Sequence, residues 1–184
     1  MNSLADRLLH KTTVITLFLA GCAAGTPIEG SNSPIPVVFV EPEKFTDARR
    51  GELEPNSPAI LEELKTFLIE TGARYVPNEM RLNIRVTDID LAGDFELFRG
   101  PRADQVRITK GLYPPHLTLE FQLVDAAGRL IKAGKRKLTD LEYQLRVTAP
   151  REDYLRYEKE LLRAWLRDEI ASLKTLTMQG DGGA

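Results

Sequence analysis

The stretch Leu117-Thr118-Leu119-Glu120-Phe121-Gln122-Leu123 decides the fold of this chain, because apolar and polar residues alternate along it without a break. Successive side chains of a β-strand point to opposite faces, so the pattern predicts a half-buried strand whose leucines and phenylalanine face a core. The turn sequence at residues 125–128 predicts a hairpin with a partner strand over about residues 129–138. Gly134 is expected to form a bulge in that partner. An antiparallel hairpin is therefore the centre of the fold.

A further strand starts at Arg81, with apolar residues at positions 82, 84 and 86. The alternation slips by one residue after Val86, because positions 89 and 91 are apolar while Asp88 and Asp90 are not. Burial of unpaired carboxylates is costly, so the slip predicts a bulge or a strand end rather than two buried aspartates. Shorter strands are expected at residues 37–40 and 105–109.

Two amphipathic helices accompany these strands. In the first, Ser57 is a candidate N-cap, Pro58 takes the first helical position and Gly72 closes the helix. The second is expected over residues 151–174, with its start marked by Thr148 and Pro150. The sequence therefore predicts an α+β fold, in which an antiparallel or mixed sheet packs against two amphipathic helices in a single domain.

The N-terminal segment carries the features of a lipoprotein signal. Arg7 and Lys11 precede about ten mostly apolar residues, which is the length of a signal-peptide core, whereas a membrane-spanning helix needs about twenty. Leu19-Ala20-Gly21-Cys22 then predicts cleavage before Cys22 and acylation of its thiol. The alternative is an ordinary cleaved signal with an incidental cysteine. Two or more acyl chains on Cys22 would hold the mature protein on a membrane.

Four regions are expected along the chain: a signal peptide over residues 1–21, an acylated cysteine and flexible tether over residues 22–36, one domain over residues 37–176, and a disordered tail over residues 177–184. The tether is assigned from its small, polar and proline residues, which lack an apolar period. Ala23 follows the cysteine where an aspartate commonly retains lipoproteins in the inner membrane. This favours the periplasmic face of the outer membrane.

Composition narrows the classes of partner and chemistry. The chain has 25 basic and 27 acidic side chains. Removal of the signal peptide takes away Arg7, Lys11 and Asp6, so the mature protein has a net charge of −3 with histidine neutral. Such a balance gives no electrostatic reason to expect a nucleic acid or an anionic membrane surface as partner. Cys22 is the only cysteine, so its acylation leaves no thiol for a disulfide, a metal site or a nucleophile. No cofactor is expected.

The inventory of reactive side chains argues against common hydrolytic machinery. The mature domain holds one histidine, His116, and two serines outside the tether, Ser57 and Ser172. Ser57 is assigned to a helix cap and Ser172 lies near a helix end, so a Ser-His-Asp site is disfavoured. One histidine cannot supply the three or four ligands of a zinc site. We therefore expect no catalytic or metal-binding residue.

The best candidates for a binding site are Asp88, Asp90, Tyr113 and His116. Asp88 and Asp90 are two apart on a strand, so they share a face and could bind a hard cation such as calcium, although the spacing is not that of an EF-hand loop. The favoured alternative is that these acids cap backbone donors in a turn near Gly93. His116 is a candidate base or ligand contact, or else a packing residue at a strand start.

A basic stretch is formed by Lys132, Lys135, Arg136 and Lys137. It could contact phosphate, lipid headgroups or an acidic partner. Charge on an exposed strand also prevents edge-to-edge association, and this second interpretation is favoured.

Several segments together resemble a bacterial envelope family known as domain of unknown function 3016. They are Phe39-Val40-Glu41-Pro42-Glu43-Lys44-Phe45-Thr46-Asp47, Thr87-Asp88-Ile89-Asp90-Leu91-Ala92-Gly93-Asp94-Phe95-Glu96, Tyr113-Pro114-Pro115, Asp140 with Tyr143, and Leu155-Arg156-Tyr157-Glu158-Lys159 followed by Leu162 and Trp165. The resemblance implies export and a single domain, but no activity, substrate or catalytic residue.

These features favour a non-enzymatic, lipid-anchored periplasmic domain that binds a protein or another envelope component. The first alternative is a module that binds a small ligand or a cation, and the next is an enzyme that uses paired carboxylates as acid and base. A concave pocket holding Asp88, Asp90 or His116 would favour the two alternatives, and convex packing around them the first hypothesis.

Overall fold

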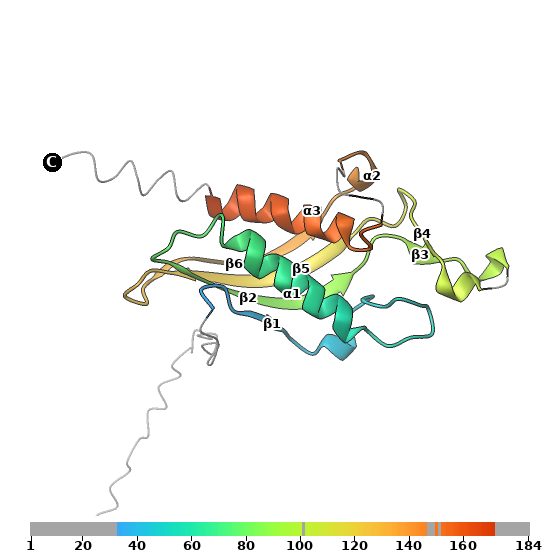
Figure 1. Cartoon of the computed structure of the whole chain (residues 1–184), viewed down its shortest axis with the longest axis horizontal. Coiled ribbons are helices and arrows are strands. Elements are labelled where there is room, and N and C mark those ends of the chain that lie inside the picture. Colours follow the sequence, from blue (N-terminus) through green and yellow to red (C-terminus); the bar gives the residue numbers. More distant parts are fainter. Residues whose placement is uncertain (1–32, 101, 147–149, 151, 172–184) are drawn as a thin grey trace, which may run out of the picture.

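The computed structural model describes residues 33–100, 102–146, 150 and 152–171 (Figure 1). The expected acylation site, Cys22, lies outside the described residues. Within them, no helix is long and apolar enough to cross a membrane.

One four-stranded sheet forms the centre of the fold, as the sequence predicts. β1 (Val37–Phe39) runs parallel to β2 (Arg81–Asp90), and β2 is antiparallel to β5 (His116–Val124). β5 is antiparallel to β6 (Leu130–Thr139), so the strand order is β1-β2-β5-β6. The expected hairpin is confirmed, and the sheet is mixed because the helix between β1 and β2 carries the chain back to the same end of the sheet.

The bulge predicted after Val86 is present. The register of β2 against β5 shifts between Val86 and Asp88, and Ile89 then lies opposite Leu117 with both side chains buried. Asp88 and Asp90 stay half-buried on the opposite face. The shift therefore keeps an apolar side chain in the core without burying either aspartate.

The bulge predicted at Gly134 is wrong. Gly134 lies directly opposite Phe121, and the register shift between β5 and β6 falls at Leu123 and Val124 instead. A Cβ atom on Gly134 would lie 2.7 Å from Nη1 of Arg136, whose guanidinium lies over the ring of Phe121 at 5.4 Å from its centroid. The glycine makes room for this guanidinium.

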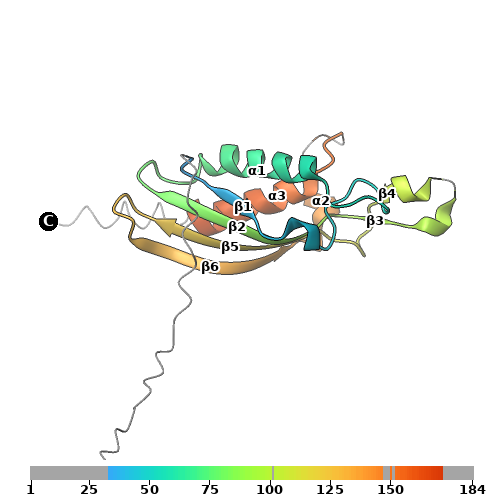
Figure 2. The ribbon, with the colours of Figure 1, turned by 90° about the horizontal axis from the view of Figure 1, so that it is seen from below.

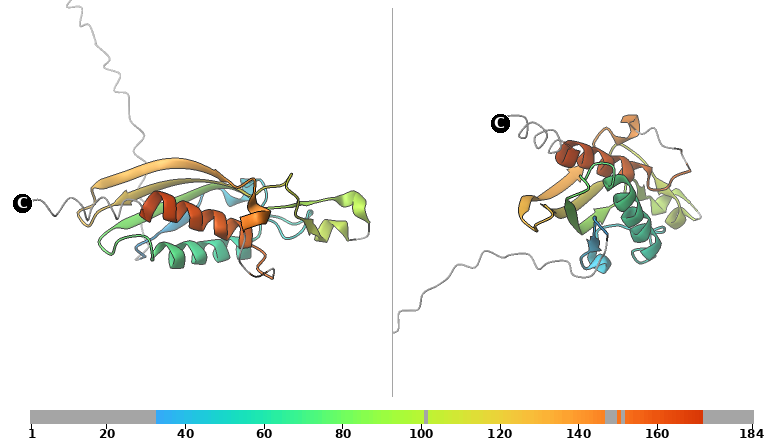
Figure 3. Two further views of the ribbon diagram at one scale, coloured as in Figure 1. Left: turned by 90° about the horizontal axis from the view of Figure 1, so that it is seen from above. Right: turned by 60° about the vertical axis from the view of Figure 1, so that its left-hand side comes forward.

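Both predicted helices pack on the same face of the sheet (Figures 2 and 3). α1 (Pro58–Gly72) follows Ser57, which takes the N-cap position but makes no side-chain cap hydrogen bond. α3 (Arg156–Trp165) continues into a π-helical turn, η4 (Leu166–Ala171). The core lies between this helical layer and the sheet. Its largest fully buried apolar side chains include Ile60, Leu64, Leu68, Leu82, Ile84, Ile89, Leu117, Leu119, Phe121 and Leu123.

The folded domain begins before residue 37, so the predicted tether boundary is too late. Ile35 is fully buried, and the carbonyls of Pro34 and Pro36 accept hydrogen bonds from the backbone N–H groups of Leu82 and Ile84. A Cβ atom on Gly72 would lie 2.7 Å from Cδ1 of Ile35, so the glycine leaves room for this segment at the end of α1.

The second helix starts later than predicted, at residue 156 rather than 151. The Asp153 carboxylate accepts the Leu155 N–H at 2.9 Å, and the first i→i−4 bond runs from Lys159 to the Leu155 carbonyl. Asp153 therefore organises the start of the helix. Thr148 lies outside the described residues.

A two-stranded arm leaves the sheet after β2. It consists of β3 (Asp94–Phe95), two 3₁₀ turns, η2 (Leu97–Arg99) and η3 (Ala103–Gln105), and β4 (Arg107–Ile108). The arm extends beyond the end of the four-stranded sheet, close to the short helix α2 (Tyr143–Arg146) (Figures 1 and 2). The strand predicted over residues 105–109 is thus only two residues long. One further 3₁₀ turn, η1 (Pro42–Lys44), follows β1.

The molecule has two distinct ends. We call the end where β2 finishes and β5 starts the cleft end, and the opposite end, with the β5–β6 turn, the hairpin end. The ten residues of β2 separate them. At roughly 3.3 Å per strand residue the separation is about 30 Å.

Candidate functional site

A cleft of about 320 Å³ opens at the cleft end. Three segments line it, and their residues are Thr46, Asp47 and Arg49, then Asp90, Leu91, Gly93 and Asp94, then Leu112, Tyr113, Pro114 and His116. Three of the four residues singled out from sequence, Asp90, Tyr113 and His116, thus meet in one concavity. Asp88 is not among the lining residues.

Main-chain hydrogen bonds hold the three segments together. The Asp47 N–H donates to the Ile89 carbonyl at 2.8 Å, and the Leu91 N–H donates to the Asp47 carbonyl at 3.0 Å. The Gly93 N–H donates to the Tyr113 carbonyl at 2.9 Å. Gly93 has a φ of 86°, and a Cβ atom there would lie 2.9 Å from the Ile108 carbonyl oxygen. Only glycine permits this close approach of the arm.

Asp90 and His116 lie directly opposite each other on β2 and β5. Burial raises the pKa of the Asp90 carboxyl, His116 opposes this, and the nearby carboxylates of Asp47 and Asp88 raise it further. The Nδ1 atom of His116 is buried and has no hydrogen-bond partner in the described part of the chain. The wall of the cleft therefore combines a partly desolvated carboxyl with an unsatisfied imidazole nitrogen.

Asp88 caps a backbone donor, as expected, but in the loop at Thr46 and not in the turn near Gly93. Its two carboxylate oxygens accept hydrogen bonds from the backbone N–H of Thr46 at 2.8 Å and from the Thr46 hydroxyl at 3.0 Å. The residue thus fixes the loop that carries Asp47. It does not join Asp90 in a cation site, and the described residues contain no cluster of three or more metal-ligating side chains.

The Tyr113 hydroxyl donates to the buried carboxylate of Glu96 at 3.3 Å, and the Lys110 ammonium pairs with the same oxygen. The Tyr143 hydroxyl donates to the Lys110 carbonyl at 2.7 Å, which attaches α2 to this region. The hydrogen bond to Glu96 therefore fixes the position of the Tyr113 side chain, which lines the cleft.

A buried ion pair supports the cleft from behind. Arg107 and Asp47 are joined at 2.8 Å, with side chains 7% and 8% exposed. The same guanidinium donates to the Tyr154 hydroxyl at 3.0 Å, to the Gly93 carbonyl at 2.8 Å and to the Arg49 carbonyl at 3.1 Å. One arginine thus joins the arm, the loop before α1 and the start of the last helix.

Glu158 is the most deeply buried acid of this region. Its side chain on α3 accepts the Ala92 N–H at 2.7 Å, while its second oxygen has no partner within the described residues. Burial raises its pKa from 4.5 to about 7, although the bond from Ala92 lowers it. Glu158 ties the last helix to the segment between β2 and the arm, but it does not line the cleft.

No role was expected for Asp47, Arg107 or Glu158 from sequence. One signal was available for Glu158, because it lies three residues after Leu155 and four before Leu162 on the apolar face of its helix. Nothing local distinguishes Arg107 from the other arginines. Its importance arises from partners 60 and 47 residues away in sequence, Asp47 and Tyr154.

Exposed apolar side chains gather around the cleft end. Of the nine large apolar side chains that are exposed in the described part of the chain, seven lie here: Leu53, Leu97, Phe98, Val106, Leu112, Leu141 and Leu145. Phe98 and Leu112 are 85% and 77% exposed. The loop of Leu53 contacts the arm through a bond from Glu52 N–H to the Asp104 carbonyl, and α2 contacts Thr109 through Gln144. We call these seven side chains of the cleft end the apolar rim, and Leu112 is the one among them that lines the cleft itself.

Residues 33–168 match the family described as "Protein of unknown function (DUF3016)". The chain belongs to this family. Comparison of the chain with curated proteins and with solved structures found no match. The segments that carry the family resemblance contribute Asp47, Asp90, Gly93 and Tyr113 to the cleft, and Glu158 behind it. Residues of this DUF3016 protein that are far apart in sequence are thus brought together at one end.

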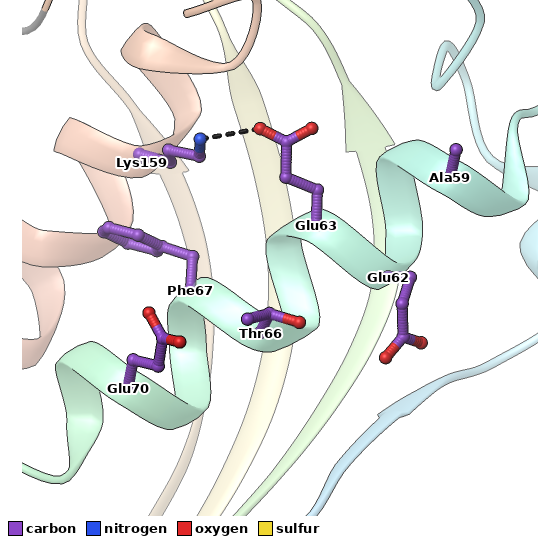
Figure 4. A pocket seen from close by; sticks show the side chains of 7 residues that line it. All are labelled: Ala59, Glu62, Glu63, Thr66, Phe67, Glu70 and Lys159. Carbon is purple, nitrogen blue, oxygen red and sulfur yellow. Dashed lines mark hydrogen bonds and ion pairs between the residues drawn. The ribbon is translucent and has the colours of Figure 1, made fainter.

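A second hollow, of about 540 Å³, lies beside α1 (Figure 4). Its lining residues are Ala59, Glu62, Glu63, Thr66, Phe67 and Glu70 of α1 and Lys159 of α3. The Lys159 ammonium reaches Glu63 at 2.7 Å and also Asp153 at 2.9 Å. The charge of Lys159 is therefore neutralised by ion pairs, one of which joins α3 to α1.

Proposed function

We propose that this protein is a non-enzymatic binding domain of the cell envelope, anchored by acyl chains on Cys22, which receives a protein partner at its cleft end. The observation that carries the proposal is that seven exposed large apolar side chains gather at the same end of the molecule as the polar cleft. Exposed apolar side chains gathered in one region, with polar groups among them, are typical of protein interaction sites.

Charge favours a partner that offers a cationic side chain to the cleft. Asp47 is already neutralised by Arg107 and Arg49. In the described residues neither Asp90 nor Asp94 has an ion-pair partner, and both line the cleft. A lysine or arginine of the partner would relieve the repulsion among these acids while its neighbours cover the rim.

Site-specific crosslinking in the native envelope tests this proposal. A photoreactive amino acid replaces Leu112 or Phe98 in the acylated protein, and in a matched control it replaces Glu62 on the exposed side of α1. We expect one common adduct from both rim positions and none from the control. The charge reversal Asp90→Lys should remove the adduct. Equal adducts from position 62, or none from the rim, would contradict the proposal.

A second candidate is a small cationic ligand bound in the same cleft. It is favoured by the concavity itself and by the Asp90 and Asp94 carboxylates that line it. A thermal-stability screen of the purified protein with polyamines, amino acids and calcium checks this, with Asp90→Asn as the control. A ligand that raises the melting temperature of the wild type but not of Asp90→Asn would make the small ligand the preferred function.

A further inference from the structure

The hairpin end carries the other two exposed large apolar side chains of the described residues, Leu130 and Ile131, which are 59% and 44% exposed. They are adjacent at the start of β6 and lie between Arg129 and Lys132. Apolar side chains flanked by cationic ones are the pattern of segments that lie in the headgroup region of a membrane.

The chain enters the fold at the same end. The Pro34 carbonyl accepts a hydrogen bond from Leu82 N–H, and Arg81 pairs with Val124 next to the hairpin turn. Ten residues, 23–32, separate Cys22 from Ser33. A segment of this length has an average span of roughly 20 Å and a fully extended reach of about 40 Å. An anchor on Cys22 would therefore keep the hairpin end within about 40 Å of the bilayer, and the cleft end lies about 30 Å from the hairpin end.

The charged groups beside the apolar pair form two ion pairs. Arg129 pairs with Asp125, and Lys132 pairs with Glu169. The Arg129 side chain is 79% exposed, so its guanidinium stays accessible to a lipid phosphate. Lys135 and Lys137 lie further along β6 towards the cleft end, opposite Glu120 and Thr118.

We infer that the β5–β6 hairpin is a membrane-contacting element, in which Leu130 and Ile131 enter the headgroup region and the exposed guanidinium of Arg129 contacts lipid phosphates. The inference rests on the proposed anchoring at Cys22. It deepens that proposal, because it gives the anchored domain one orientation and presents the cleft away from the bilayer. Pairing of two copies along β6 is disfavoured, since it would bring Lys135 and Lys137 of both chains together.

Fluorescence of the acylated protein in protein-free vesicles tests the inference. Acylation consumes the only natural thiol, so the variant Ile131→Cys offers a single site for an environment-sensitive dye. The matched control is Leu145→Cys, which is 86% exposed in the wild type and lies at the cleft end. Vesicles contain phosphatidylcholine alone or with phosphatidylglycerol, and carry lipids with a quencher at the headgroup.

We expect quenching at position 131 but not at position 145, and we expect it to increase with phosphatidylglycerol and decrease with salt. Leu130→Asp in the Ile131→Cys background should reduce the quenched fraction roughly tenfold. Equal quenching at both positions, quenching only at position 145, or no quenching in vesicle-bound protein would overturn the inference. Protein that lacks acyl chains by mass spectrometry and fails to co-float with vesicles would instead refute the anchoring.

Discussion

Glu158 shows how one side chain links burial to pH dependence. Its carboxyl is 1% exposed and accepts a single backbone hydrogen bond, from Ala92. Because burial disfavours the charged form, its pKa rises from 4.5 to about 7. Below pH 4.5 the carboxyl is neutral in both the folded and the unfolded chain, so its ionisation does not change the free energy of unfolding there.

As the pH rises from 4.5 towards 7, the unfolded chain loses this proton while the folded chain keeps it. Folding stability should therefore fall across this window and level off above pH 7, by on the order of 3 kcal/mol in total. Glu158→Gln keeps the acceptor for Ala92 N–H and removes the titration. Urea unfolding at several pH values should show that the free energy of unfolding of the variant increases relative to that of the wild type as the pH rises.

The control for this prediction is Glu142→Gln, whose carboxylate is 64% exposed in the wild type. Its stability should follow that of the wild type at every pH. If Glu158→Gln also runs parallel to the wild type, the carboxyl is not the source of the pH dependence.

At the scale of the elements, the ion pair between Arg107 of β4 and Asp47 holds the arm against the rest of the fold. Removal of one partner from a buried ion pair leaves an uncompensated charge, so Arg107→Met should destabilise the protein by about 3–5 kcal/mol. The double variant with Asp47→Asn should lose less than the sum of the single changes. Denaturant unfolding measures the losses, and hydrogen exchange should show faster opening of β3 and β4.

Arg85→Gln is the matched change in an exposed pair. Arg85 and Glu120 are 37% and 43% exposed and 3.7 Å apart, so the loss should stay below about 1 kcal/mol. A loss of similar size for Arg107→Met would show that the buried pair does not hold the arm.

The basic stretch of β6 is divided by the pleat of the strand. Lys132 and Arg136 pair with Glu169 beside the helices, and together they lower the pKa of its carboxyl to about 2. Lys135 and Lys137 point to the opposite face of the strand, and both are exposed. Period-two alternation predicts this division, but the identity of the paired carboxylate required the three-dimensional packing.

Anchoring is a property of the whole molecule and stays a prediction. Cys22→Ser removes the thiol that acylation needs, so the protein should move from the membrane to the soluble fraction on cell fractionation. Leu112→Asp is the control, because it changes the cleft end and should leave the protein with the membrane. Persistent membrane association of Cys22→Ser would refute the lipid anchor.

The sequence alone predicted the fold class, the central hairpin, the bulge after Val86 and the family resemblance. These features could be predicted because they rest on local periodicity and on the order of residues along the chain. The same patterns gave Asp90, Tyr113 and His116 as site candidates, although they assigned Asp88 to the group as well.

Only the tertiary structure decided what surrounds these residues. Asp47, Arg107 and Glu158 act through partners that lie many residues away, and no local pattern encodes which distant groups will meet. The start of the last helix was likewise set by the Asp153 side chain, although proline is common at a helix start. Periodicity fixes which face of an element is buried, whereas charges, cavities and exposed rims depend on how the elements pack.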